Sequence, residues 1–368
     1  MFRSADKTKQ LNLALQGGGA HGAFTWGVLD RLLDEADLKF GWISGASAGA
    51  VNAVAFAAGL AESGSAGARD RLRGIWEAVI DAGVSDLLRL NPFLYGISRS
   101  QTVGQMATLL SPYDFNPLGF DPLRKVLEQH IDFESLRRSE GPELLIAATD
   151  VATARPRLFR REEMTLEVIL ASACLPQVHQ AVEIDGRLYW DGGFSANPDL
   201  LTLASESPVD DTLLVLLNAI ESAAIPRSAR EIAGEVSRVT FTQPLVRDVM
   251  EIAAMQAEVQ PRPFWDRKPM PRSQRIGRHR FHMIEAGAHV DTLPPESKMR
   301  PERALITHLH NAGRAETGKW LMQSKAKVGR ASSVNLAARL LPPLKPIRVE
   351  KEPDLEHAEE RENNVVKL

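Results

Sequence analysis

Short apolar runs alternate with segments of helical periodicity near the start of the chain. The run Leu11–Leu15 predicts a buried strand. After a glycine-rich turn, apolar side chains recur at helical spacing along one face of a predicted helix, at Phe24, Val28, Leu29, Leu32 and Leu33. A second run, Phe40–Ile43, predicts another strand, and a helix of small residues follows to about Leu60. This strand–helix–strand–helix order indicates a parallel sheet with crossover helices.

Further strands are predicted at Glu143–Thr149, Thr212–Leu217 and Arg280–Glu285. Between the first two of these, Val182–Tyr189 predicts a β-hairpin, because an Asp-Gly pair in its middle favours a two-residue turn. The expected fold class is therefore α/β, a three-layer α/β/α domain built on a mostly parallel sheet.

The chain divides into a principal domain and two C-terminal segments. Residues 10–218 hold the alternating pattern, and a proline- and aromatic-rich insertion at 82–120 is expected to form an apolar cap. Residues 219–344 predict a helical, basic extension packed on this domain, with two helices that break at Pro244. Residues 345–368 hold seven acids and five bases with few core-forming residues, which is typical of a solvated tail.

Composition narrows the class of protein. Apolar residues make up 44% and charged residues 25% of the 368 residues, which is ordinary for a globular protein. The formal net charge of −3 argues against nucleic acid as a partner of the whole molecule. A single cysteine, Cys174, excludes an internal disulfide framework and a cysteine-based zinc site. The charged N-terminal residues lack the apolar core of a signal peptide, and no apolar run is long enough to span a membrane, so we expect a cytoplasmic protein.

A G-x-S-x-G pattern, Gly45–Gly49, follows the second predicted strand and precedes a helix. In such a pattern a sharp turn exposes the serine hydroxyl, and the flanking glycines let the strand and the helix pass close to each other. The start of the following helix also favours a developing negative charge. Ser47 is therefore a candidate nucleophile, and the alternative is a plain tight turn.

A second glycine-rich turn, Gly17–Gly22, lies between the first strand and the first helix. Its row of backbone N–H groups can bind a phosphate or an oxyanion. The turn also matches the G-x-G-x-x-G pattern of dinucleotide-binding proteins, which place an acid at the end of the next strand. That strand ends in Trp42-Ile43-Ser44 without an acid. A nucleotide-binding oxidoreductase is therefore the weaker alternative.

The identity of a catalytic base is less clear from the residues alone. Asp191 follows the predicted hairpin and precedes two glycines, so it can stand at a cleft with little steric cover or lie in an ordinary surface turn. None of the nine histidines falls at a clear strand end, but composition excludes none of them as the base of a Ser-His-acid triad.

Taken in order, Gly17–Gly22, Gly45–Gly49 and Asp191–Gly193 resemble the motifs of the patatin-like phospholipase family. The segment Ala171–Pro176 resembles the Ala-Ser segment ending in proline that precedes the family's aspartate. The resemblance covers roughly residues 10–218. It implies a serine lipid acyl hydrolase that cleaves acyl esters of lipids, phospholipids among them, and that needs neither a metal nor a cofactor.

The resemblance also implies a role for each residue of the site. Ser47 would be the nucleophile, and Asp191 would be the base of a Ser-Asp dyad that works through an acyl-serine intermediate. The oxyanion hole would be formed by backbone N–H groups of Gly17, Gly18, Gly19 and Ala48. His21 and Pro176 would contact the substrate.

His21 departs from the family pattern, which usually has Arg or Lys at this position. A side chain that titrates near neutrality therefore replaces a fixed positive charge. Because a helix start disfavours protonation, we expect a neutral imidazole at pH 7 and better use of neutral esters than of phospholipids. The alternative is that His21 only packs or hydrogen-bonds near the loop.

Residues 262–280 hold seven bases and one acid, with aromatic residues between them. Such a stretch can make a peripheral contact with an anionic membrane, at about 1 kcal/mol per base, or it can be a solvated loop that covers the domain. A catalytically silent lipid-binding module of the same fold is a further alternative to the hydrolase. The two differ in that only the hydrolase has an activated serine.

Overall fold

The computed structural model describes residues 8–90, 111–116, 119, 121–218, 225–262, 265, 268–341 and 343. Eight strands form a sheet in the order β5-β6-β3-β2-β1-β7-β8, and β4 pairs with β3 outside this path. They are β1 (Lys9–Leu15), β2 (Leu38–Gly45), β3 (Glu143–Asp150), β4 (Pro156–Arg160), β5 (Val182–Ile184), β6 (Arg187–Asp191), β7 (Asp211–Leu216) and β8 (Arg280–Glu285). The pairings among β3, β2, β1, β7 and β8 are parallel, and those of β4, β5 and β6 are antiparallel. The predicted mostly parallel sheet is confirmed.

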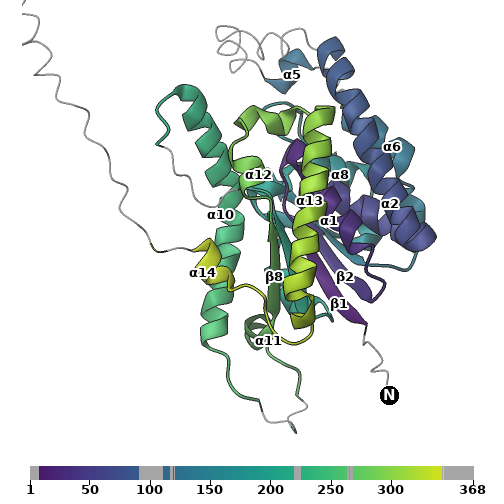
Figure 1. Ribbon diagram of the computed structural model, residues 1–368. Coiled ribbons are helices and arrows are strands. Elements are labelled where there is room, and N and C mark those ends of the chain that lie inside the picture. Colours follow the sequence, from purple (N-terminus) through teal and green to yellow (C-terminus); the bar gives the residue numbers. More distant parts are fainter. Residues whose placement is uncertain are drawn as a thin grey trace, which may run out of the picture.

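Helices cover both faces of this sheet (Figure 1). One layer contains α1 (Gly22–Leu32), α2 (Ala48–Leu90) and α13 (Arg303–Ser324), and the other contains α9 (Leu201–Glu206), α10 (Ala229–Ala257), α11 (Arg272–Arg278) and α14 (Leu336–Leu340). Shorter helices are α5 (Pro112–Phe115), α6 (Pro122–His130), α7 (Phe133–Arg138), α8 (Leu166–Ser172) and α12 (Ala288–Asp291). Within the described ranges, no helix combines the length and the apolar character that crossing a membrane requires.

Alternating side chains of the central strands explain the three layers. On β1, Leu13 and Leu15 belong to the core beneath α1, α2 and α13, whereas Ala14 belongs to the core beneath α10 and α14. On β7, Leu213 and Leu214 divide between the two cores in the same way. Successive strand residues point to opposite faces, so a continuous apolar run is buried on both sides.

Three features differ from the sequence-based expectations or fall outside them. The expected break at Pro244 is wrong, because α10 continues through this residue. The following turns bury Leu245, Val249 and Ile252, and this packing outweighs the hydrogen bond that a proline removes. Strand β4 was not predicted. The proposed cap at 82–120 lies mostly outside the described residues, although α2 runs into it and α5 lies within it.

Candidate active site

Ser47 occupies a sharp turn between β2 and α2. Its backbone φ of 54° lies in the left-handed region, which is uncommon for a residue other than glycine. A Cβ atom on Gly49 would lie 2.1 Å from the carbonyl oxygen of Leu15, and one on Gly45 would lie 2.8 Å from Gly49. The two glycines of the G-x-S-x-G pattern are therefore required by the close crossing of strand and helix. The strained turn leaves Ser47 partly exposed.

The glycine loop, residues 17–19, lies beside this turn. It follows β1, and Leu15 at the end of β1 pairs with Gly45 at the end of the parallel strand β2. A Cβ atom on Gly17 would lie 2.8 Å from the Cβ atom of Ser47, so the loop touches the turn. The two motifs that the sequence singled out therefore meet at the carboxyl edge of the sheet.

Residues 172–174, at the end of α8, accept hydrogen bonds from the backbones of both Ser47 and Asp191. The backbone N–H of Ser47 donates to Ser172, whose carbonyl oxygen lies at 3.0 Å and whose Oγ lies at 3.1 Å. The backbone N–H of Asp191 donates to the carbonyl oxygen of Cys174 at 2.8 Å. Ser172 was not assigned a role from the sequence, although the Ala-Ser segment that contains it was recognised.

Asp191 ends β6 and is fully buried. Its Oδ1 accepts a 2.7 Å hydrogen bond from the backbone N–H of Gly193, while Oδ2 has no hydrogen-bond partner. Burial raises the pKa of this carboxyl from 3.8 to about 7, and the Gly193 N–H and the nearby Ser47 hydroxyl oppose part of the rise. A carboxyl with a pKa near neutrality is suited to proton transfer as a general base.

The backbone N–H groups of the glycine loop and of the Ser47 turn differ in whether they have partners. The N–H of Gly17 is occupied, because it donates to Oδ1 of Asn197 at 2.8 Å. Among residues 17–19 and 47–48, the N–H groups of Gly18, Gly19 and Ala48 have no hydrogen-bond partner in the described part of the chain, and these three residues are partly exposed. These three N–H groups are available to a ligand, whereas that of Gly17 is used to hold the loop.

His21 is buried beneath the glycine loop, with 3% of its surface exposed. Its Nε2 lies 2.8 Å from Oγ of Ser297. Burial, assisted by the positive charge of Lys298, lowers the pKa of His21 to about 4. This pKa agrees with the expected neutral imidazole at pH 7, and its main cause is burial rather than the helix start. Pro176 lies partly buried in the turn that follows α8.

A buried network on β7 and β8 contains the residue types of a catalytic triad but lies elsewhere. Nδ1 of His282 is 3.0 Å from Oγ of Ser333, and Nε2 is 3.1 Å from Oδ1 of Asp211. Asp211 begins β7, so the network lies at the amino ends of the parallel strands, away from Ser47. Asp211 also forms an ion pair with Arg280. Among the described residues, no histidine hydrogen-bonds with Ser47 or Asp191.

The remaining features flagged in the sequence have structural partners. The Cys174 thiol is buried and donates to the carbonyl oxygen of Gln180, and burial raises its pKa to about 12, which disfavours the nucleophilic thiolate. In the basic stretch, Arg275 donates to the carbonyl of Ser207 and Arg278 to that of Gln260. This stretch includes α11, at the end of the molecule opposite α12 (Figure 1).

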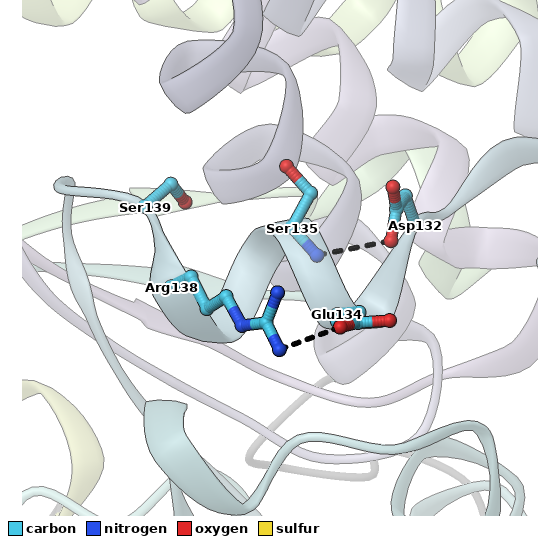
Figure 2. A pocket seen from close by; sticks show the side chains of 5 residues that line it. All are labelled: Asp132, Glu134, Ser135, Arg138 and Ser139. Atoms are coloured by element: carbon cyan, nitrogen blue, oxygen red, sulfur yellow. Dashed lines mark hydrogen bonds and ion pairs between the residues drawn. The ribbon is translucent and has the colours of Figure 1, made fainter.

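A surface hollow of about 400 Å³ lies at α7. Figure 2 shows that its five lining side chains are polar and that two internal contacts, Asp132 with Ser135 and Glu134 with Arg138, engage most of them. Because α7 leads into the amino end of β3, this hollow is separate from Ser47 and Asp191.

The fold is a three-layer α/β domain in which a G-x-S-x-G turn joins a parallel strand to a helix. The patatin-like phospholipase family matches residues 13–204, and the chain belongs to this family. Comparison with curated proteins finds no match. Among solved structures, the crystal structure of VipD from Legionella pneumophila is similar, with a TM-score of 0.40 and 15% sequence identity over 86% of this chain and 67% of the VipD chain. Membership of the family implies lipid acyl hydrolase activity on lipid substrates.

Proposed function

We propose that the protein is a lipid acyl hydrolase in which Ser47 and Asp191 form a catalytic dyad. The observation that supports this most strongly is the strained turn of Ser47 beside a fully buried carboxyl. Residues 10–218 form the catalytic domain of the proposal, and β8 and α13 from the extension at 219–344 complete its layers.

The dyad cleaves an ester in two steps. Asp191 takes the proton of the Ser47 hydroxyl while Oγ attacks the ester carbonyl carbon. The N–H groups of Gly18, Gly19 and Ala48 stabilise the oxyanion, and each such donor is typically worth about 10²–10³ in rate. The tetrahedral intermediate collapses, the alcohol leaves with the proton held by Asp191, and Ser47 keeps the acyl group.

Water then removes the acyl group. Asp191, again a carboxylate, accepts a proton from water as its oxygen attacks the acyl carbonyl, and the same donors stabilise the second oxyanion. Collapse returns the proton to Oγ of Ser47 and releases the carboxylic acid. A base with a pKa of about 7 holds the proton readily in each step and loses it readily between them.

Substitutions test this assignment with a short-chain nitrophenyl ester as substrate. We expect Ser47→Ala to abolish turnover while the chain stays folded, because Ala adds no volume to a turn flanked by alanines. Ser333→Ala is the matched control, since this serine belongs to the network at the amino ends of the strands, and it should keep full turnover. Turnover by Ser47→Ala at the wild-type rate would refute the assignment, and loss of turnover in the control would move the site to the second network.

A further inference from the structure

The short helix η4 (Pro295–Met299) is packed against the glycine loop. A Cβ atom on Gly19 would lie 2.3 Å from the carbonyl oxygen of Lys298, so the two backbones are in direct contact. Ser297, the preceding residue, is the hydrogen-bond partner of His21. A segment of the C-terminal extension therefore packs directly against the glycine loop, which lies beside Ser47.

The ammonium group of Lys298 lies at the carboxyl ends of β1 and β7. Its Nζ donates to Oδ1 of Asn218 at 2.6 Å. The backbone N–H of Asn218 in turn donates to Oε1 of Gln16 at 2.9 Å, and Gln16 immediately precedes the glycine loop. The positive charge is thus held on the side of the loop formed by β7.

This charge has no carboxylate partner among the residues that the structure describes. Burial and the neighbouring Arg238 lower the pKa of Lys298 to about 8, so the group remains mostly protonated at pH 7. Removing an ammonium group from water without a counter-charge is costly, so the site favours an anion.

The nucleophile and this charge are two strands apart. Strand β1 lies between β2, which leads into Ser47, and β7, which leads to Asn218, and neighbouring strands are about 4.8 Å apart. In a glycerophospholipid the phosphate and the ester carbonyl are separated by only a few bonds. An ester carbonyl at Ser47 can therefore place its phosphate near Lys298.

We propose that the Lys298 ammonium group binds the phosphate of a phospholipid substrate while the ester lies at Ser47. This inference rests on the proposed function. It supplies from η4 the positive charge that His21 does not carry, and it replaces the preference for neutral esters expected from His21 alone with a preference for phospholipids.

The test compares two substrates that share their acyl esters, of which only the first carries a phosphate, in a phosphoglycerol headgroup. Dihexanoyl phosphatidylglycerol and dihexanoylglycerol are hydrolysed as monomers by the full chain, and kcat/KM is measured for each. A charge-assisted hydrogen bond contributes about 1.5–3 kcal/mol, so Lys298→Met should lower the phospholipid-to-neutral ratio about 10- to 100-fold. Lys298→Arg should preserve most of the ratio. Lys319→Met, which removes an exposed lysine of α13, is the matched control and should leave the ratio unchanged.

Asn218→Asp provides a second variant of nearly the same shape, and it decides the question if Lys298→Met does not fold. It places a carboxylate against the ammonium group and should lower the ratio. An equal loss on both substrates, or an unchanged ratio in both variants, would overturn the inference and leave Lys298 as a structural contact. Absence of activity on both substrates in the wild-type chain would instead refute the proposed function.

Discussion

Replacing Asp191 by Asn removes the proposed base and also a buried charge. The Asn oxygen can still accept the hydrogen bond from Gly193, and the new NH₂ group takes the place of Oδ2, which has no partner in the wild-type chain. The shape of the site is therefore preserved. We expect loss of ester turnover together with a gain in stability at high pH.

The size and sign of this gain follow from the pKa of Asp191. The carboxyl has a pKa of about 7 in the folded chain and 3.8 as its ordinary value. At pH values between these two pKa values, the unfolded chain has lost the proton that the folded chain keeps. The free energy of unfolding of the wild type therefore falls by about 1.36 kcal/mol per pH unit as the pH rises, and it levels off above about pH 7. From about pH 4.5 to pH 8 the wild type should lose up to about 3 kcal/mol through this group, and Asp191→Asn should not.

Urea unfolding at the two pH values measures the difference. Asp248 is also buried with a pKa raised to about 7, but it is common to both chains and cancels in the comparison. Asp185→Asn is the matched control, because this residue lies exposed in the turn of the same hairpin, with a φ of 50° that asparagine tolerates. If Asp191→Asn changes stability by the same amount at both pH values, the carboxyl titrates normally and the base is misassigned.

Four further outcomes are expected. For the wild type, kcat/KM on a neutral ester should rise with pH and reach half its maximum near pH 7, because only the Asp191 carboxylate accepts the proton; a flat profile from pH 5 to 9 would contradict this. Gly49→Ala should abolish activity, because its Cβ atom would clash with the carbonyl of Leu15. Gly318→Ala, in open space on α13, should instead stabilise the chain by about 0.5–1 kcal/mol. Equal effects of the two substitutions on thermal unfolding and turnover would refute the close crossing of strand and helix at Gly49. His282→Ala should lower stability by about 1–3 kcal/mol and retain kcat, whereas loss of kcat with unchanged stability would make the second network catalytic. Arg272→Glu should leave co-sedimentation with anionic vesicles unchanged, because the basic stretch at residues 262–280 lies away from Ser47. Weaker co-sedimentation of this variant would favour a membrane contact through the basic stretch.

Local patterns in the sequence predicted the parts of the fold that depend on neighbouring residues. The strands at Leu11–Leu15 and Thr212–Leu217 follow from apolar runs, and the hairpin that turns at Asp185-Gly186 follows from its turn residues. The turn at Ser47 was predictable because the two glycines that it requires lie with the serine inside one five-residue pattern.

Contacts between distant segments were not predictable in this way. Ser172 binds the backbone of Ser47, and Asn197 holds Gly17, across separations of 125 and 180 residues. Lys298 reaches the glycine loop from the C-terminal extension, where no local pattern marks it. The pKa of Asp191 likewise depends on burial by the whole fold, which its Asp-Gly-Gly motif does not report.

The most direct test of the dyad is the rate and position of covalent labelling by a fluorophosphonate, followed by mass spectrometry of the digested protein. Only an activated serine reacts readily with this reagent. We predict a single adduct on Ser47 in the wild type, much slower labelling in Asp191→Asn, and unchanged labelling in Ser333→Ala. An adduct on another serine, or labelling of Ser47 at the same rate with and without the Asp191 carboxylate, would contradict the account.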